Sequence, residues 1–257
     1  MKHENTKEIK TYMDSFALTE EQIQFYDTNG YLLIKSVWSK QEIDIIRNDM
    51  DDLADGHFTN KLDQHYHRSL RKAHAGKKMC DIGDTLLRGR AIPIGSISFF
   101  CKPNNPLEHG SVWHQDNYAG KTPDGNNYLN LAIAVDDADE SNGSLKVVPG
   151  SHRLGLLPCN PKANFSRDEL GRLYQCAPIG NNCEIPEGFP IIQLAYEEGD
   201  VLAVNGLLVH SADKNTHPTR WRRSIYNVYI KENEPFWPGF TAKRRLLERY
   251  DSPEGWE

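Results

Sequence analysis

The chain has 257 residues, of which 38% are hydrophobic and 10% aromatic, and it carries a formal net charge of −6. This content supports a sizeable core in one large or two small domains. The negative charge argues against a nucleic-acid binder, which usually shows a strongly basic face. No apolar run approaches the ~18 residues that cross a membrane, and the N-terminal MKHENTKEIKTYMDS lacks the apolar stretch of a secretory signal.

The five cysteines are odd in number, irregular in spacing and without a Cys-x-x-Cys pair. That usage is typical of free thiols in a reducing compartment rather than of a disulfide framework, and it argues against a zinc finger or ribbon. We therefore expect a cytoplasmic protein. The cysteines are Cys80, Cys101, Cys159, Cys176 and Cys183.

The first part of the chain predicts two helices separated by a short strand over residues 31–38, YLLIKSVW. Each helix begins with a Ser or Thr that is followed three residues later by Glu or Gln, and each is expected to end at a glycine. These residues are Thr19, Gln22 and Gly30 for the first helix, and Ser39, Glu42 and Gly56 for the second.

One strongly basic segment follows, between His57 and Lys78. It contains Lys61, Arg68, Arg71, Lys72, Lys77 and Lys78 together with four histidines. One interpretation is a solvated helix or loop. The other is a lid for an anionic substrate, because fixed positive charge at a cleft raises the local anion concentration. The sequence leaves both interpretations open.

From residue 92 the hydrophobic pattern becomes that of strands, which alternate between two faces. The predicted strands are short, rich in β-favouring residues and separated by Pro, Gly, Asn and Asp. They cover residues 92–101, 128–135, 144–148, 190–196, 200–210 and 224–230. Such a succession predicts a sandwich or barrel. Residues 151–189 are expected to form an insertion over one mouth of it.

The stretch SVWHQD, residues 111–116, places His114 and Asp116 two residues apart. On a strand end these side chains share one face, whereas Gln115 points away. His210 comes at the end of the apolar run 200–210 and joins them if the two strands are neighbours. Two histidines and one carboxylate on one face leave positions open, which is how non-haem Fe(II) binds O₂ and a chelating cosubstrate.

A candidate carboxylate receptor follows in RWRRSIYNVY. Arg222 and Ser224 are two residues apart on a predicted strand and share a face, and a guanidinium with a neighbouring hydroxyl suits a carboxylate. In the alternative interpretation, Arg222 and Arg223 simply flank the strand in solvent. His152, in the turn sequence PGSH, is expected to be structural rather than a ligand.

Four segments together resemble the phytanoyl-CoA dioxygenase (PhyH) family of Fe(II)- and 2-oxoglutarate-dependent oxygenases. They are WHQDN, LAIAVDDADESNGSLKVVPGSH, GDVLAVNGLLVHSADKN and RRS. The resemblance covers about residues 20–232 and is strongest over 95–155 and 196–228. It implies a mainly β (α+β) fold: a double-stranded β-helix, or jelly-roll (cupin-like) barrel, with the N-terminal helices packed on one sheet.

The resemblance also implies the site. His114, Asp116 and His210 match the family's catalytic iron ligands, with Fe(II) as cofactor and with 2-oxoglutarate and O₂ as cosubstrates. The carboxylate of Asp116 favours hydroxylation over halogenation, because halogenating relatives have a small residue at this position. The expected reaction oxidises an unactivated C–H bond of a small molecule and releases succinate and CO₂.

Arg222 matches the family's basic residue that binds the distal carboxylate of 2-oxoglutarate, with Ser224 beside it. Arg220 and Arg223 lie at similar distances from His210, but the Arg-x-Ser spacing favours Arg222. Lys102, in FFCKP, resembles a family lysine near the cosubstrate or the substrate.

We expect a single oxygenase domain over residues 1–257, as a monomer or homodimer, with a small-molecule substrate and no nucleic-acid or membrane partner. Its expected parts are a flexible segment 1–18, helical support and lid 19–90, barrel core 91–232 and C-terminal tail 233–257. Two rival interpretations are a zinc-dependent hydrolase on the same residues and a non-catalytic jelly-roll binding module. The hydrolase lacks an evident general base and leaves the Arg-x-Ser pair unexplained. No motif identifies the substrate.

Overall fold

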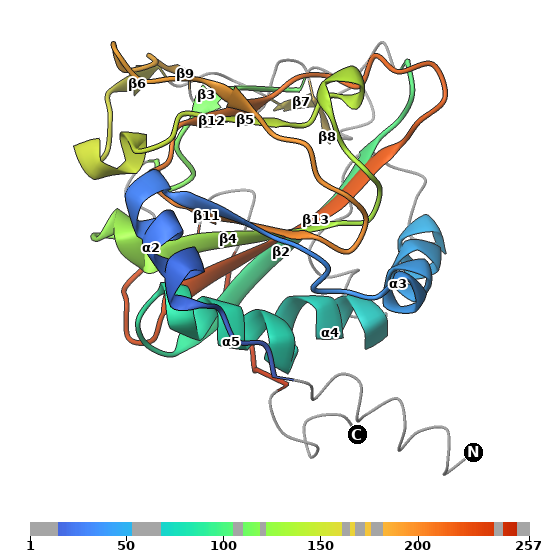
Figure 1. The fold of residues 1–257 in the computed structure, drawn as a ribbon, viewed down its shortest axis with the longest axis horizontal. Coiled ribbons are helices and arrows are strands. Elements are labelled where there is room, and N and C mark those ends of the chain that lie inside the picture. The colour runs from blue at the N-terminus through green and yellow to red at the C-terminus, as the bar shows by residue number, and fades with distance from the viewer. Residues whose placement is uncertain are drawn as a thin grey trace.

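The computed structural model describes residues 15–52, 68–104, 110–118, 122–160, 165–167, 173–175, 182–238 and 244–250. Its centre is formed by two antiparallel sheets that face each other, with helices below the larger sheet (Figure 1). The predicted mainly β fold with helices packed on one sheet is therefore confirmed. Among the described residues, no helix is long and apolar enough to cross a membrane.

The N-terminal elements follow the predicted capping signals. Helix α2 (Glu20–Asn29) begins with a complete capping box between Thr19 and Gln22, and Gly30 ends it with a φ of 77°. Strand β1 (Tyr31–Ile34) is shorter than predicted because the chain turns at residues 35–38.

Helix α3 (Lys40–Asp52) also begins as predicted. The Glu42 carboxylate accepts a hydrogen bond from the Ser39 backbone N–H at 2.8 Å, and the Ser39 hydroxyl accepts one from the Glu42 N–H at 3.3 Å. The predicted end of this helix at Gly56 lies outside the described residues.

The larger sheet has the strand order β1-β11-β4-β13-β2. Its remaining strands are β11 (Val201–Asn205), β4 (Tyr128–Ala134), β13 (Arg222–Lys231) and β2 (Ala91–Cys101). Alternation along β4 divides its side chains between two cores. Leu129, Leu131 and Ile133 join the core that contains residues of α3, α4 (Arg68–Ala75) and α5 (Lys77–Leu86), whereas Ala132 and Ala134 join the core between the sheets.

The smaller sheet has the order β10-β5-β12-β3. Its strands are β10 (Ile192–Gln193), β5 (Leu145–Val147), β12 (His210–Ala212) and β3 (Ser111–His114). Leu145 and Val147 of this sheet pack with Ala132, Ala134 and Leu202 of the larger one. The side chains on the inner faces of both sheets line the space between them, which we call the interior.

Shorter elements connect the sheets. The one-turn 3₁₀ helices are η2 (Gly125–Asn127), η3 (Glu140–Asn142) and η4 (Ser151–Leu154). Within the predicted insertion 151–189, strands β6 (Cys159–Asn160) and β9 (Asn182–Cys183) pair with each other, as do β7 (Phe165–Arg167) and β8 (Leu173–Gln175). The described part of this segment therefore has regular structure of its own.

The prediction of one continuous strand over residues 200–210 is wrong. The chain leaves the larger sheet after Asn205 and enters the smaller sheet at His210. The Asn205 side chain accepts a hydrogen bond from the Leu207 N–H at 2.9 Å, and the Gly206 N–H bonds to the Tyr128 carbonyl at 2.8 Å. Residues 207–209 are apolar and buried within the turn, so the run resembles a strand in the sequence.

The described part of the basic segment packs on the outer face of the larger sheet, where α4 and α5 contribute to the core. Lys78 forms an ion pair with Glu42 at 2.9 Å, and Lys77 forms one with Asp81 at 2.8 Å. These two charges stabilise the helical layer on the side away from the space between the sheets. Residues 57–67, on which the lid interpretation now depends, lie outside the described residues.

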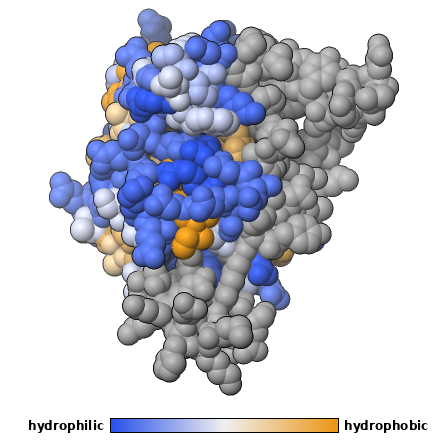
Figure 2. Space-filling model, turned by 90° about the vertical axis from the view of Figure 1, so that its right-hand side faces the viewer, coloured by the Kyte–Doolittle hydropathy of each residue, from blue (hydrophilic) through white to orange (hydrophobic). Residues whose placement is uncertain are grey.

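The described part of the face shown in Figure 2 is mostly hydrophilic.

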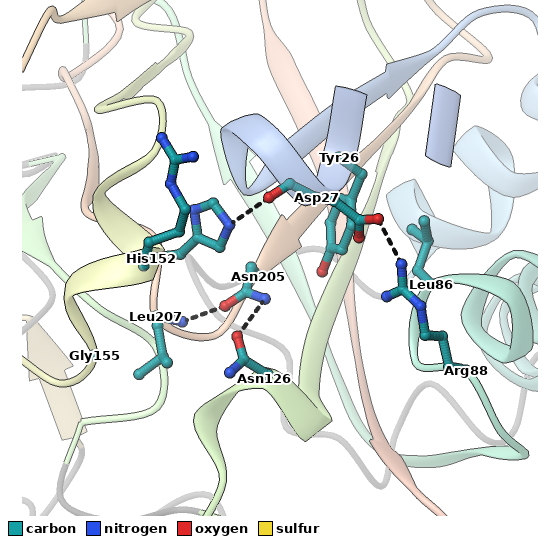
Figure 3. A pocket seen from close by; sticks show the side chains of 10 residues that line it. Tyr26, Asp27, Leu86, Arg88, Asn126, His152, Gly155, Asn205 and Leu207 are labelled. Carbon is teal, nitrogen blue, oxygen red and sulfur yellow. Dashed lines mark hydrogen bonds and ion pairs between the residues drawn. The ribbon is translucent and has the colours of Figure 1, made fainter. Parts of the chain in front are cut away.

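His152 lies in η4, beside a polar cavity of about 420 Å³ (Figure 3). Its Nε2 is 3.1 Å from the Asp27 carbonyl, so it must carry a proton and donate. Its buried Nδ1 has no hydrogen-bond partner among the described residues. Nδ1 also faces Gly30, where an added Cβ would lie 2.5 Å from it. These contacts join α2 to η4 and agree with a structural role for His152.

Burial lowers the pKa of His152. The unfolded chain therefore binds a proton more readily than the folded one, so this contribution to stability is fully present above the unfolded pKa of about 6.5 and is lost as the pH falls. We expect His152→Gln, which keeps an N–H donor, to flatten the decline of unfolding free energy between pH 8 and pH 5.5. Urea titrations of the wild type and the variant at several pH values would measure the unfolding free energy. Equal slopes for wild type and variant would contradict the assignment.

Candidate metal centre

Three side chains from the smaller sheet and the loop after it form a compact polar group. His114 is the last residue of β3, His210 is the first of β12, and the two are direct partners across the antiparallel pair. Asp116 follows β3 by two residues. One ligand atom from each of the three residues lies within 4.8 Å of the others. The structure thus brings together all three residues that the sequence predicted as metal ligands.

Both imidazoles are oriented for metal binding. His114 Nδ1 is 2.6 Å from the Val112 carbonyl, and His210 Nδ1 is 3.0 Å from the Leu208 carbonyl. A carbonyl only accepts, so each Nδ1 carries the proton and each Nε2 presents a lone pair. This backbone support sets the tautomer that a metal-binding histidine requires.

The Nε2 atoms face the carboxylate of Asp116. The distances are 3.6 Å from His114 Nε2 to Oδ1 and 3.4 Å from His210 Nε2 to Oδ2. Both exceed the usual 2.7–3.2 Å of an N–H···O hydrogen bond. The donor set therefore fits a cation held between the three side chains, and two imidazole nitrogens with one carboxylate on one face suit non-haem Fe(II).

Two further polar residues, of which the sequence analysis did not identify Asn130, support this group. Asn130, on the inner face of β4, donates a hydrogen bond from Nδ2 to Asp116 Oδ2. Gln115 points away from the group, as predicted, but it is buried rather than exposed. Its Nε2 donates to the Leu207 carbonyl at 2.6 Å, and its Oε1 accepts from the Leu157 N–H at 2.7 Å. Gln115 thereby joins the end of β3 to the turn that leads into β12.

Further along the interior lie Arg222 and Ser224, the two residues that the sequence predicted to bind a carboxylate. Arg222 is 5% exposed, and its Nε donates to the Asn142 carbonyl at 3.0 Å, which fixes the guanidinium. Ser224 lies on the same face of β13, and its buried hydroxyl has no hydrogen-bond partner among the described residues. An unsatisfied buried hydroxyl costs free energy unless a ligand completes it. A buried cation beside an unsatisfied hydroxyl is chemically suited to an anionic group such as a carboxylate.

The neighbouring arginines point elsewhere. Arg223 binds both carboxylate oxygens of Asp136, with Nε at 2.8 Å and Nη2 at 2.9 Å, and its Nη1 binds Asp51 at 2.8 Å. Arg220 pairs with Asp139 at 2.7 Å. A hydrogen bond from the Ser141 hydroxyl, together with Arg220, lowers the pKa of Asp139 to about 2. Among the three candidates, Arg222 alone points to the interior.

Lys102 is exposed just beyond the end of β2. Its Nζ lies 5.6 Å from the centre of the Trp221 ring, which also packs against the core on the outer side of the larger sheet. Cys101, one residue earlier, is the direct partner of Arg222 across the strands, so Lys102 alternates to the other face. This position does not support contact between Lys102 and the cosubstrate, and the assignment stays a prediction.

Tyr226 lies close enough to both the metal-binding group and Arg222 for the charges of Asp116 and Arg222 to act on it. It follows Arg222 and Ser224 on the same face of β13, and its ring packs edge-on against Phe99 with centres 5.0 Å apart. Burial raises the pKa of Tyr226 far above its usual range, and the charges of Arg222 and Asp116 both act on it. Its phenol therefore stays protonated between the metal-binding group and the arginine. The spacing of two along β13 was the only sequence signal for this residue.

Comparisons with known proteins agree with this geometry. The model of the phytanoyl-CoA dioxygenase (PhyH) family matches residues 26–224. Phytanoyl-CoA dioxygenase 1 of Oryza sativa subsp. japonica is 27% identical over an alignment that covers 93% of this chain and 96% of the relative. An ectoine dioxygenase of Nocardia farcinica is 25% identical, with 84% of this chain and 80% of the relative covered.

Solved structures share the fold. The epimerase SnoN, solved with Fe³⁺, alpha ketoglutarate and nogalamycin RO, is similar with a TM-score of 0.68 at 18% identity, covering 85% of this chain and 86% of its own. EctD from S. alaskensis, solved with 2-oxoglutarate and 5-hydroxyectoine, has a TM-score of 0.67 at 16% identity, covering 93% and 90%. The family model matches residues 26–224, which is most of the chain, and this match shows that the chain belongs to the phytanoyl-CoA dioxygenase (PhyH) family.

Proposed function

We propose that this chain is an Fe(II)- and 2-oxoglutarate-dependent dioxygenase that oxidises a C–H bond of a small molecule. One observation carries the proposal. The same interior holds an open-faced group of two histidines and one carboxylate, and a buried arginine beside an unsatisfied serine hydroxyl. Neither a zinc hydrolase nor a binding module accounts for the buried arginine beside an unsatisfied serine hydroxyl.

The residues have separate tasks in this proposal. His114, Asp116 and His210 would hold Fe(II), and Arg222 and Ser224 would bind the distal carboxylate of 2-oxoglutarate and so orient that molecule in the interior. With 2-oxoglutarate and O₂, bound Fe(II) supplies an oxidant strong enough to remove hydrogen from an unactivated C–H bond, and succinate and CO₂ are released.

The remaining interior side chains set the environment of the reaction. The methyl groups of Ala132 and Ala134 and the side chains of Leu145 and Val147 exclude water between the sheets. The protonated phenol of Tyr226 offers a neutral hydrogen-bond donor close to both ends of the site. Asn130 holds the Asp116 carboxylate in one orientation.

We further propose hydroxylation as the outcome, since the Asp116 carboxylate occupies the position that halogenating relatives leave open. Relatives named for ectoine and for L-proline support a small polar substrate.

Pairing of β1 with β11 joins the N-terminal part of the chain to the larger sheet, which supports a single domain over residues 1–257. A cytoplasmic location is supported by the irregular cysteine spacing.

The proposal is tested by a substrate-library screen with anaerobically iron-loaded protein. We expect succinate to form only when Fe(II), 2-oxoglutarate and O₂ are all present, with one oxidised product for each succinate from the true substrate. Zinc-loaded protein serves as the control and should yield no succinate. Hydrolysis of a library member by the zinc form, without 2-oxoglutarate, would favour the hydrolase instead.

A further inference from the structure

Two of the cysteines lie directly opposite each other. Cys159 of β6 and Cys183 of β9 are partners across an antiparallel pair. Directly opposed residues in such a pair have Cβ atoms about 4.5–5.5 Å apart, near the roughly 3.5–4.5 Å that a disulfide spans. Both thiols are free in the structure. A small closing movement of this two-residue ladder would therefore bring the sulfur atoms into bonding distance.

The two thiols differ in their surroundings. Cys183 is 4% exposed and belongs to a small core with Val148 and Val209. Cys159 is partly exposed, packs against the same core, and hydrogen-bonds to the hydroxyl of Tyr118. One cysteine is thus open to a reagent in solution, whereas the other is reached most easily through its neighbour.

We propose that Cys159 and Cys183 form a reversible disulfide site whose co-reactant is a low-molecular-weight disulfide such as oxidised glutathione. In the first step, the Cys159 thiolate attacks one sulfur of oxidised glutathione, forms a mixed disulfide and releases one reduced glutathione. In the second step, the Cys183 thiolate attacks the Cys159 sulfur and releases the other. Two thiols are oxidised and one disulfide is reduced, so hydrogen and electrons balance.

The second step is limited at neutral pH by the small fraction of Cys183 that is thiolate. Burial raises the pKa of the Cys183 thiol to about 11, and only the thiolate attacks a disulfide. The bond should therefore form faster as the pH rises from 7 to 9. In a reducing cytosol such disulfides are usually transient and redox-sensing rather than permanent.

The position of the pair gives the bond a local role. It would close a ring around residues 160–182, the larger part of the predicted insertion. Trp113 of β3, like Cys159, packs against the small core that contains Cys183, and His114 is the next residue. Tyr118, which contacts Cys159, lies two residues after Asp116. The disulfide would hold the base of the insertion against the strand that carries the metal-binding group.

The test uses the full-length, iron-loaded protein under anaerobic conditions. Reduced protein is incubated with oxidised glutathione, remaining thiols are alkylated in denaturant, and peptides are mapped by mass spectrometry without reduction. We expect one crosslinked pair that contains Cys159 and Cys183 and has lost two hydrogen atoms. Cys80, which is fully buried, is the internal reference and should remain alkylated.

Two variants test the order of the steps. In Cys183→Ala, Cys159 should accumulate as the mixed disulfide with glutathione. In Cys159→Ser, Cys183 should remain a free thiol, because it is buried. The proposal is overturned if wild-type protein keeps both thiols alkylated, if either cysteine pairs with Cys176 instead, or if oxidation spreads equally to Cys80. The peptide map of the wild-type protein tests the formation of the disulfide even if a variant folds poorly.

Discussion

His210→Ala is expected to abolish stoichiometric binding of Fe(II). His210 is buried, and its Nε2 is oriented toward Asp116 by the hydrogen bond of Nδ1 to the Leu208 carbonyl. Loss of a residue that merely supports a metal ligand weakens metal binding about 10- to 100-fold. Loss of one of only three ligands should exceed that range. Anaerobic iron titration measures the affinity, and the visible charge-transfer band that appears on adding 2-oxoglutarate reports the intact site.

Two variants calibrate this result. His217→Ala removes a half-buried histidine whose Nδ1 accepts a hydrogen bond from the Arg220 N–H, away from the metal-binding group, and should leave iron binding unchanged. Asn130→Ala removes the hydrogen bond to Asp116 and should weaken iron binding about 10- to 100-fold. An unchanged iron stoichiometry and band in His210→Ala would show that the metal is held elsewhere.

Arg222→Ala is expected to raise the KM for 2-oxoglutarate by roughly two to three orders of magnitude. The guanidinium is 5% exposed, and its position is fixed by the Asn142 carbonyl. Removing one partner of a buried charge pair costs about 3–5 kcal/mol, and about 1.4 kcal/mol corresponds to one order of magnitude. Iron binding should be nearly unchanged. Arg222→Lys should rescue only partly, because an ammonium lacks the planar fork of donors. Initial rates against 2-oxoglutarate concentration measure the effect.

Arg223→Ala is the matched control on the adjacent residue. Its ion pairs with Asp136 and Asp51 lie outside the interior, so the variant should lose stability to urea yet keep the KM for 2-oxoglutarate within about twofold. The opposite pattern, with a large effect in Arg223→Ala and none in Arg222→Ala, would mean that the register of β13 differs by one residue.

Much of the candidate site was predictable because its signals are local. Arg222 and Ser224 share a face because both lie on strand β13. The same spacing identified His114 and Asp116, although Asp116 lies in the turn that follows β3 rather than on the strand. Capping boxes located the starts of α2 and α3 for the same reason. The link between His114 and His210 required a long-range pairing, and the family resemblance supplied it.

The remaining features depend on contacts between distant residues. Nothing near Asn130 in the sequence indicates a bond to Asp116. The ion pairs of Arg223 with Asp136 and Asp51 likewise join residues that are far apart in the sequence. The turn at Asn205 was missed because its apolar residues are buried, as a strand's would be. The basic segment was ambiguous because charge content alone does not reveal partners such as Glu42.

The direct pairing of His114 with His210 across β3 and β12 has a consequence for the nascent protein. The two residues are separated in the sequence by most of the strands, so neither half of the chain holds the complete donor set. A fragment that ends before His210 has only two of the three donors, and a chain whose smaller sheet is unformed does not bring His114 and His210 together. The complete donor set for the metal can therefore form only after His210 has been synthesised and the smaller sheet has folded.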